Sequence, residues 1–210
     1  MESYYLAPYY TELIAVTSIA VFMALLPGVD FVMVTRTSIR EGRFAGFYTT
    51  LGICLSICMH ATYTLAGLAV VIANSVWIFS IIQYLGAAYL IYMGWQLLKN
   101  NQQINTDLDI DNKPVTSLSA LRSGFMTNML NPKAPLFFLS IFTQVVAIDT
   151  PFSIQIIYAS IIVFAHFIWF SAVTLLLSHP SLLPRFNRYK HTIDKLAGIV
   201  LVAFAIKIII

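Results

Sequence analysis

Leu26-Pro27-Gly28-Val29-Asp30 interrupts the first long apolar segment of the chain, which runs from about residue 11 to residue 35. A proline inside a helix lacks the N–H for the backbone hydrogen bond and clashes with the preceding turn. The adjacent glycine lowers the cost of a local bend. Asp30 follows within one turn, at a depth where hydrocarbon makes a charge costly. This stretch predicts a membrane helix broken at Pro27 and Gly28, with a carboxylate at the break.

A second stretch of the same kind is Asn131-Pro132-Lys133-Ala134-Pro135, and Pro132 follows Pro27 by half of the 210-residue chain. Pro132 and Pro135 are expected to break a second membrane helix. Two broken helices at matching places in two halves are typical of secondary transporters, whose substrate site lies at the breaks.

The composition supports a membrane protein. Hydrophobic residues make up 59% and charged residues 10% of the chain, against roughly 25% charged residues in soluble domains. The formal charge of +3 gives no support for a nucleic-acid partner. The sequence has no constellation of catalytic nucleophiles, no phosphate-binding loop and no cluster of metal ligands, so we expect no enzyme activity, no metal and no cofactor.

The apolar segments predict an all-α polytopic protein with six membrane-spanning helices, each reaching the roughly 20 residues that a bilayer requires. Their approximate limits are 11–35, 45–73, 76–98, 119–147, 152–178 and 191–210. A polar linker over 99–118 divides the chain into 1–98 and 119–210, with three spans in each part. Because three is odd, the second part enters the membrane from the opposite side. One integral membrane domain built from two inverted three-helix repeats is therefore predicted.

Lysine and arginine set the orientation, because cytoplasmic loops retain them. Of the 12 basic residues, all but Lys133 and Lys207 fall in or beside the first, third and fifth connections. We therefore expect these connections in the cytoplasm and both termini outside. The sequence leaves a homo-oligomer possible.

Asp30 and Lys133 are the charged residues placed deep in the predicted spans. One interpretation is a mutual ion pair that closes the helix bundle, since a lone buried ion is costly. The other is that Asp30 binds a substrate ammonium group, while Lys133 or the N–H groups of Gly28 and Ala134 bind a carboxylate. A zwitterionic amino acid fits the second interpretation, and the bilayer surrounds either arrangement.

Asn128 and Asn131 flank the second break. Their amides are expected either to satisfy backbone groups that the prolines leave unpaired or to contact the substrate.

Two histidines in the spans are candidates for proton coupling, together with Asp30. His60 belongs to a stripe of small and polar residues with Gly52, Ser56 and Thr64, and His166 lies in the fifth span. An intramembrane histidine can exchange protons near neutral pH. The alternative for His60 is close helix packing along this stripe.

Several motifs in order resemble the LysE/RhtB amino-acid exporters over nearly the whole chain. They are Pro27-Gly28-Val29-Asp30-Phe31, Arg40-Glu41-Gly42-Arg43-Phe44-Ala45-Gly46, Gly52 with His60, residues 85–94, Gly124-Phe125 with Asn128, Leu130-Asn131-Pro132-Lys133-Ala134, and Leu196-Ala197-Gly198. The chain departs from the family at Val29, where a second proline is common, and at Ala205, where glycine is common. The resemblance implies export of amino acids or related metabolites across a bacterial inner membrane, commonly by proton antiport.

Two other kinds of membrane protein are weaker alternatives. A cation or metal-ion exporter would want several convergent carboxylates, but Asp30 stands alone at the breaks. A thiol–disulfide conduit would want cysteines at the breaks, whereas Cys54 and Cys58 share one helix elsewhere. A motif for binding nucleotide is also absent, so an ion gradient is the expected energy source.

Overall fold

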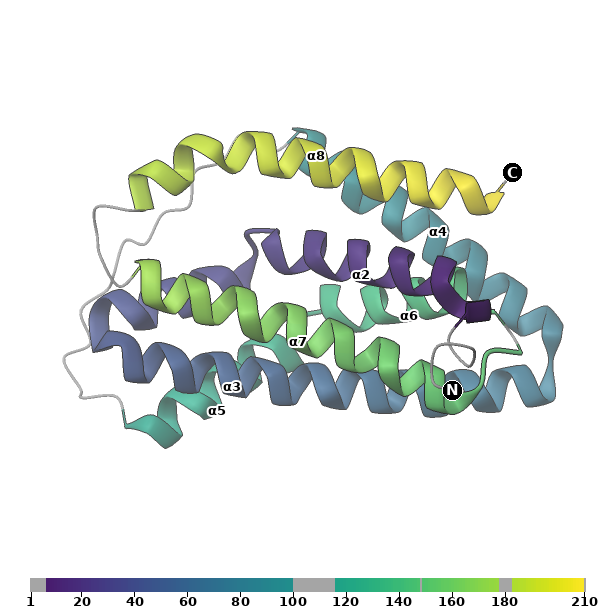
Figure 1. Ribbon diagram of the computed structural model, residues 1–210, viewed down its shortest axis with the longest axis horizontal. Helices are drawn as coiled ribbons and strands as arrows, with labels where there is room; N and C mark the ends of the chain where they lie inside the picture. The colour runs from purple at the N-terminus through teal and green to yellow at the C-terminus, as the bar shows by residue number, and fades with distance from the viewer. Residues whose placement is uncertain (1–6, 100–115, 148, 178–182, 210) are drawn as a thin grey trace.

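The computed structural model describes residues 7–99, 116–147, 149–177 and 183–209, and this part of the chain is helical without a strand (Figure 1). The elements are η1 (Ala7–Tyr9), α2 (Tyr10–Leu25), α3 (Val29–Asn74), α4 (Val76–Lys99), α5 (Ser117–Met129), α6 (Lys133–Val145), α7 (Phe152–Leu177) and α8 (Leu183–Ile209).

The first break lies where the sequence predicts it. α2 ends at Leu25, and α3 begins after Gly28, whose backbone is extended. Asp30 falls in the first turn of α3. The partial positive charge of a helix N-terminus favours a carboxylate at this position.

The second break is also confirmed, with one correction. α5 ends at Met129 and α6 begins at Lys133, so the interruption covers residues 130–132. Pro135 lies inside the first turn of α6 rather than at the break. The first N–H groups of a helix have no intrahelical partner, so the missing N–H of Pro135 costs little there.

The predicted connection between the first two spans is largely helical. α3 continues through it, and the one residue with non-helical angles is Gly42, at φ 87° and ψ 177°. Side chains disfavour a positive φ, which glycine tolerates. Figure 1 shows α3 folding back on itself in its first part. A glycine turn therefore replaces the loop that the sequence predicts.

Most of the other boundaries agree with expectation. α3 ends at Asn74, α4 begins at Val76, and α7 begins directly after Pro151. α8 begins at Leu183, two turns before the predicted start near residue 191. Lys99 closes α4 and Ser117 opens α5. The predicted linker between them lies, at residues 100–115, outside the described part.

The helices pack in two main sets. α3 lies against α5 and α7, and α4 lies against α6 and α8, while α2 packs on α7. The α3–α5 contact is made at the backbone, because a Cβ at Gly52 would overlap the carbonyl oxygen of Leu121, and a Cβ at Gly124 would overlap that of Thr49. At Gly52, the close packing expected of the small-residue stripe is present.

Polar contacts also occur away from the breaks, one set around Glu12 of α2 and one pair within α8. The carboxylate of Glu12 in α2 accepts hydrogen bonds from the Tyr158 hydroxyl of α7 at 3.0 Å and from Thr150 at 3.1 Å. In α8, the Lys190 ammonium lies 2.6 Å from the Asp194 carboxylate, and both side chains are buried.

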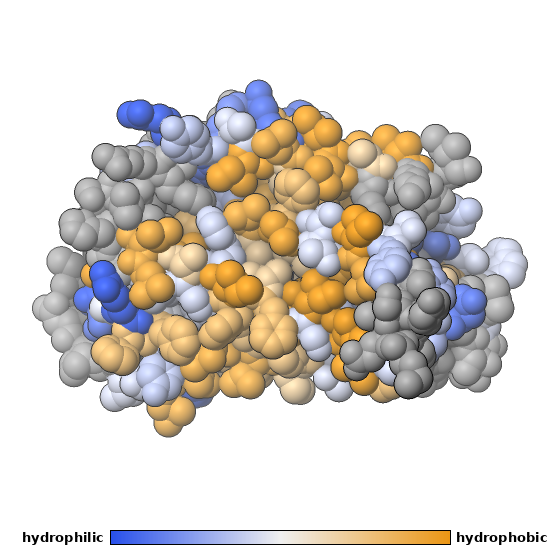
Figure 2. Space-filling model, in the orientation of Figure 1, coloured by the Kyte–Doolittle hydropathy of each residue, from blue (hydrophilic) through white to orange (hydrophobic). Residues whose placement is uncertain are grey.

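The surface fits a lipid environment. Val29–Leu68, Trp77–Lys99 and Phe152–Leu176 are long and apolar enough to cross a membrane, and α2 and α6 are shorter apolar helices. Large apolar side chains such as Phe164 and Ile168 are exposed. Figure 2 shows apolar residues across the middle of the visible face and hydrophilic residues towards its edges. The protein is a polytopic helical membrane protein.

Candidate functional site

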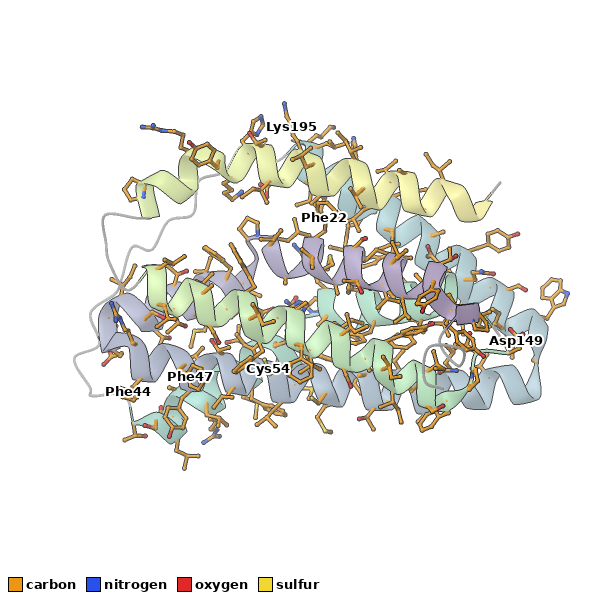
Figure 3. All side chains as sticks on the ribbon, in the orientation of Figure 1. Phe22, Phe44, Phe47, Cys54, Asp149 and Lys195 are labelled. Carbon is orange, nitrogen blue, oxygen red and sulfur yellow. The ribbon has the colours of Figure 1, made fainter. Side chains whose placement is uncertain are left out.

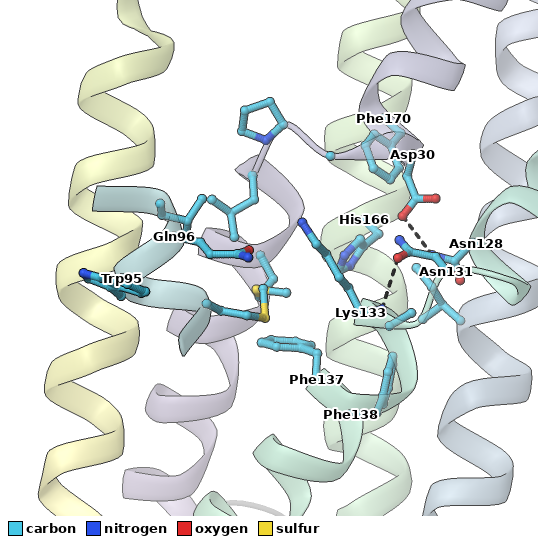
Figure 4. Close-up of a pocket in the computed structure, with 18 of the residues that line it drawn as sticks. Asp30, Trp95, Gln96, Asn128, Asn131, Lys133, Phe137, Phe138, His166 and Phe170 are labelled. Atoms are coloured by element: carbon cyan, nitrogen blue, oxygen red, sulfur yellow. Dashed lines mark hydrogen bonds between the residues drawn. The ribbon is translucent and has the colours of Figure 1, made fainter. Parts of the chain in front are cut away.

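A cavity of about 530 Å³ joins the two helix breaks. Pro27, Gly28 and Asp30 line it from the first break (Figure 4). The second break contributes Asn131, Lys133 and Ala134, with Asn128 from the end of α5. Residues from the two halves of the sequence therefore share one site, and the volume is within the roughly 300–1,000 Å³ of small-molecule sites.

Asp30 is held by a residue of the other half. Its Oδ2 atom accepts a hydrogen bond of 2.9 Å from the amide of Asn128, a side chain that is 3% exposed. The other oxygen, Oδ1, is buried and has no hydrogen-bond partner within the described residues. A buried carboxylate with one oxygen unsatisfied is costly, and a cation beside Asp30 would offset this cost.

Lys133 lines the same cavity but does not pair with Asp30. The salt bridges given for the described residues, Arg40–Glu41 and Lys190–Asp194, do not include a pair between Lys133 and Asp30. The mutual ion pair considered from the sequence is therefore absent. Lys133 is the first residue of α6, and a helix N-terminus adds further positive potential around its ammonium group. The surroundings of Lys133 therefore favour an anion.

Asn131 organises the start of α6. Its Oδ1 accepts a 3.1 Å hydrogen bond from the Lys133 N–H, and its carbonyl accepts a 3.2 Å bond from the Ala134 N–H. The Ala134 N–H, one of the donors expected for a substrate carboxylate, is engaged by this turn in the structure. Ala134 contributes to the cavity lining.

His60 lies behind the site rather than in the lining of the cavity. Its side chain is 1% exposed, and its Nε2 atom is 3.3 Å from the carbonyl oxygen of Asn128. In a continuous helix this carbonyl would accept from the N–H of residue 132, which proline lacks. Because a carbonyl oxygen only accepts hydrogen bonds, we place the ring proton of His60 on Nε2. The Nδ1 atom then accepts a hydrogen bond from the Tyr63 hydroxyl.

His166 lies in the lining of the cavity, on α7. Its Nδ1 atom donates to the carbonyl of Ile162 at 2.8 Å, and its ring packs edge-on against Phe170 at 5.9 Å between centroids. Nδ1 is therefore protonated in this arrangement, and Nε2 is the nitrogen left for the cavity.

Sequence reasoning missed much of the wall. Met23, Trp95, Gln96, Phe137, Phe138 and Phe170 line the cavity. Apolar residues at helical spacing look alike whether they face a cavity, a core or lipid. Of these residues, Phe170 could have been predicted, because it follows the candidate His166 by one helical turn.

The described residues also contain no group of three or more His, Cys, Asp or Glu that could hold a metal ion.

Comparison with known proteins identifies the family. The model of the LysE type translocator family matches residues 21–210. The chain belongs to this translocator family. The resemblance inferred from the motifs is thereby confirmed, and the translocator is a membrane transport protein rather than an enzyme.

Bacterial membrane proteins are among the relatives of the translocator. The uncharacterized membrane protein YrhP of Bacillus subtilis is 31% identical, covering 93% of this chain and 97% of the relative. The threonine efflux protein of Salmonella typhimurium is 28% identical, with 93% and 96% covered. The threonine efflux protein of Escherichia coli K12 is 26% identical, with 94% and 97% covered. No solved structure matches the chain.

Proposed function

We propose that the translocator exports a zwitterionic amino acid from the cytoplasm through the cavity at the helix breaks. The observation that carries this proposal is that Asp30 and Lys133, of opposite charge, line one cavity without an ion pair between them. An amino acid supplies an ammonium group for the first and a carboxylate for the second. The threonine efflux proteins among the relatives support the same substrate class.

Asp30 and Lys133, the two charged poles of the site, have distinct roles in this proposal. Asp30 binds the substrate ammonium, while Asn128 holds its Oδ2 atom. Lys133 binds the carboxylate, assisted by the positive N-terminal end of α6. Asn131 fixes the start of α6 and so the place from which Lys133 projects.

The topology in this proposal consists of six spans in two inverted repeats, 1–98 and 119–210, in a bacterial inner membrane. α2 and the part of α3 before Gly42 form the first span, and α5 and α6 form the fourth. The matching positions of the two breaks support this arrangement. Both termini are placed outside because the basic residues concentrate at the opposite side.

Neutralising either pole tests the function. Asp30→Asn and Lys133→Met should each abolish amino-acid efflux from preloaded vesicles, while membrane insertion and thermal unfolding stay near those of the wild type. Asp149→Asn and Lys195→Met are matched controls, because both residues are exposed and outside the cavity lining. These controls should transport normally. Normal efflux by a folded Asp30→Asn protein would remove Asp30 from the site and overturn the proposal.

Proton antiport is the proposed energy source, since uphill export needs a gradient. Asp30, His166 and His60 are its candidate carriers. The measurement is efflux with an imposed pH gradient, acidic outside, at clamped membrane potential. An acidic exterior should accelerate export several-fold, and a rate that ignores the gradient would leave facilitated diffusion or another counter-ion.

A further inference from the structure

The cavity has few charges beyond those that the proposed function uses. With Asp30 and Lys133 engaged by the substrate backbone, the other titratable groups in its described lining are His166 and Lys99. The Lys99 ammonium lies 3.9 Å from the centroid of the Trp95 ring, and both residues are exposed. The lining offers no second carboxylate, so a lysine or arginine side chain would enter without a counter-ion. Such a buried charge is strongly disfavoured.

Apart from Gln96, Asn128 and Asn131, the remaining wall is apolar, and it comes from five helices. Its main side chains are Met23 of α2, Ile57 of α3, Met93 of α4, Phe137 and Phe138 of α6, and Phe170 of α7.

Most of this wall is fixed by packing. Ile57, Phe137, Phe138 and Phe170 are each at most 3% exposed. The Phe138 ring stacks near Phe142 with 6.3 Å between centroids. Figure 4 shows Phe137 and Phe138 on the side of the cavity away from Asp30. A substrate held by Asp30 and Lys133 therefore meets a wall of closely packed apolar groups.

We infer that the substrate is an amino acid with a large, uncharged, apolar side chain, of the leucine or methionine kind. This inference rests on the proposed function and narrows it. Each additional methylene in a hydrophobic pocket is worth about 10–200-fold in discrimination. Leucine and methionine should therefore be preferred over threonine by about tenfold or more in apparent affinity. This preference would distinguish the translocator from its relatives that are threonine efflux proteins.

The direct test is a panel of five substrates with the full-length protein in vesicles. L-leucine, L-methionine, L-threonine, L-lysine and L-glutamate are supplied one at a time, and efflux is measured over a range of internal concentrations. Competition against bound radiolabelled L-leucine, measured on purified protein, gives the affinities independently of coupling. We expect leucine and methionine to show the lowest half-saturation concentrations and lysine the weakest competition.

A wall variant links the preference to the cavity. Met23→Ser places a small polar side chain in a half-buried wall position and should reduce the preference for leucine over threonine by about tenfold. Met126→Ser is the matched control, since Met126 is exposed on α5 and does not line the cavity. The control should keep the wild-type preference. A ratio unchanged in Met23→Ser would show that this wall does not select the side chain.

The outcomes separate the inference from the function on which it rests. Preferred transport of threonine, lysine or glutamate would overturn the inference and leave amino-acid export intact. Absence of both efflux and binding for all five substrates would overturn the proposed function and the inference with it. A preference for leucine and methionine that falls in Met23→Ser, but not in Met126→Ser, supports both.

Discussion

At the scale of single residues, His60 of α3 supplies a hydrogen bond to the backbone at the end of α5, beside the second break. Pro132 deprives the Asn128 carbonyl of its usual donor, and the Asn131 N–H, at 3.0 Å, and the His60 ring supply hydrogen bonds in its place. The Asn128 amide in turn holds Asp30. His60 is thus two contacts away from the free oxygen of Asp30, as a positioning residue rather than part of the cavity wall.

This arrangement predicts different results for two substitutions of His60. His60→Leu removes one of the two donors and should destabilise the protein by about 0.5–1.5 kcal/mol, because the Asn128 carbonyl then keeps only the bond from the Asn131 N–H. It should also impair efflux. The amide of His60→Gln can still donate, so this variant should retain most of the efflux and its response to an imposed pH gradient. Thermal unfolding and vesicle efflux measure both effects.

The His60→Gln variant also tests whether His60 carries the proton that is coupled to export. If His60 carries the proton, glutamine cannot replace it, and the pH response of His60→Gln should vanish while its stability remains. That result would contradict the positioning role and make His60 the strongest of the coupling candidates.

Local sequence rules predicted the charged poles of the site but not their partners. Asp30 and Lys133 stand out because proline, glycine and a charge occur together within a few residues. His60 and Asn128, in contrast, are 68 positions apart. Their contact depends on how α3 and α5 cross, which no short stretch encodes. The engagement of the Ala134 N–H was missed for a related reason, since it depends on the turn that Asn131 adopts.

At the scale of helices, the close contact of α3 with α5 requires glycine at two positions. Gly52 and Gly124 bring the two backbones together one turn before Asn128, near the end of α5. Small residues permit such close approach. The register of α5 against α3 therefore determines where the second break meets His60.

Adding one methyl group tests this contact. Gly52→Ala and Gly124→Ala should each lower the free energy of unfolding by about 1–3 kcal/mol, because the new Cβ overlaps backbone that cannot rotate away. Gly67→Ala is the matched control in α3, since a Cβ there meets nothing within 4 Å. It should be neutral or slightly stabilising because alanine favours helix. Thermal unfolding in detergent would compare the three, and equal midpoints would contradict the close contact.

Helix ends were more predictable than helix surroundings. Prolines and glycines mark both breaks and the start of α7. The early start of α8 was missed, as was the buried pair of Lys190 with Asp194. Charges four positions apart near a helix start usually indicate a solvated face. Their burial follows from tertiary packing, which the pattern does not reveal.

At the scale of the whole molecule, the bundle has two distinct ends. Phe44 and Phe47 lie at one end and Asp149 at the other (Figure 3). α5 begins at the end opposite Asp149 (Figure 1). Between these ends the visible surface is largely apolar. A membrane fits around this middle, with the two ends in different compartments.

Cysteine labelling tests the orientation that the basic residues predict. Ser117→Cys and Asp149→Cys would each be made in a protein with Cys54 and Cys58 replaced by alanine, and both chosen sites are exposed. Because lysine and arginine are retained in the cytoplasm, a membrane-impermeant maleimide should label Asp149→Cys on intact cells. Ser117→Cys should react only after the membrane is opened. The cysteine-free protein controls for background, and the permeabilised sample shows that both sites can react. The reverse pattern would invert the proposed topology, and labelling of both sites from outside would contradict a membrane between the two ends.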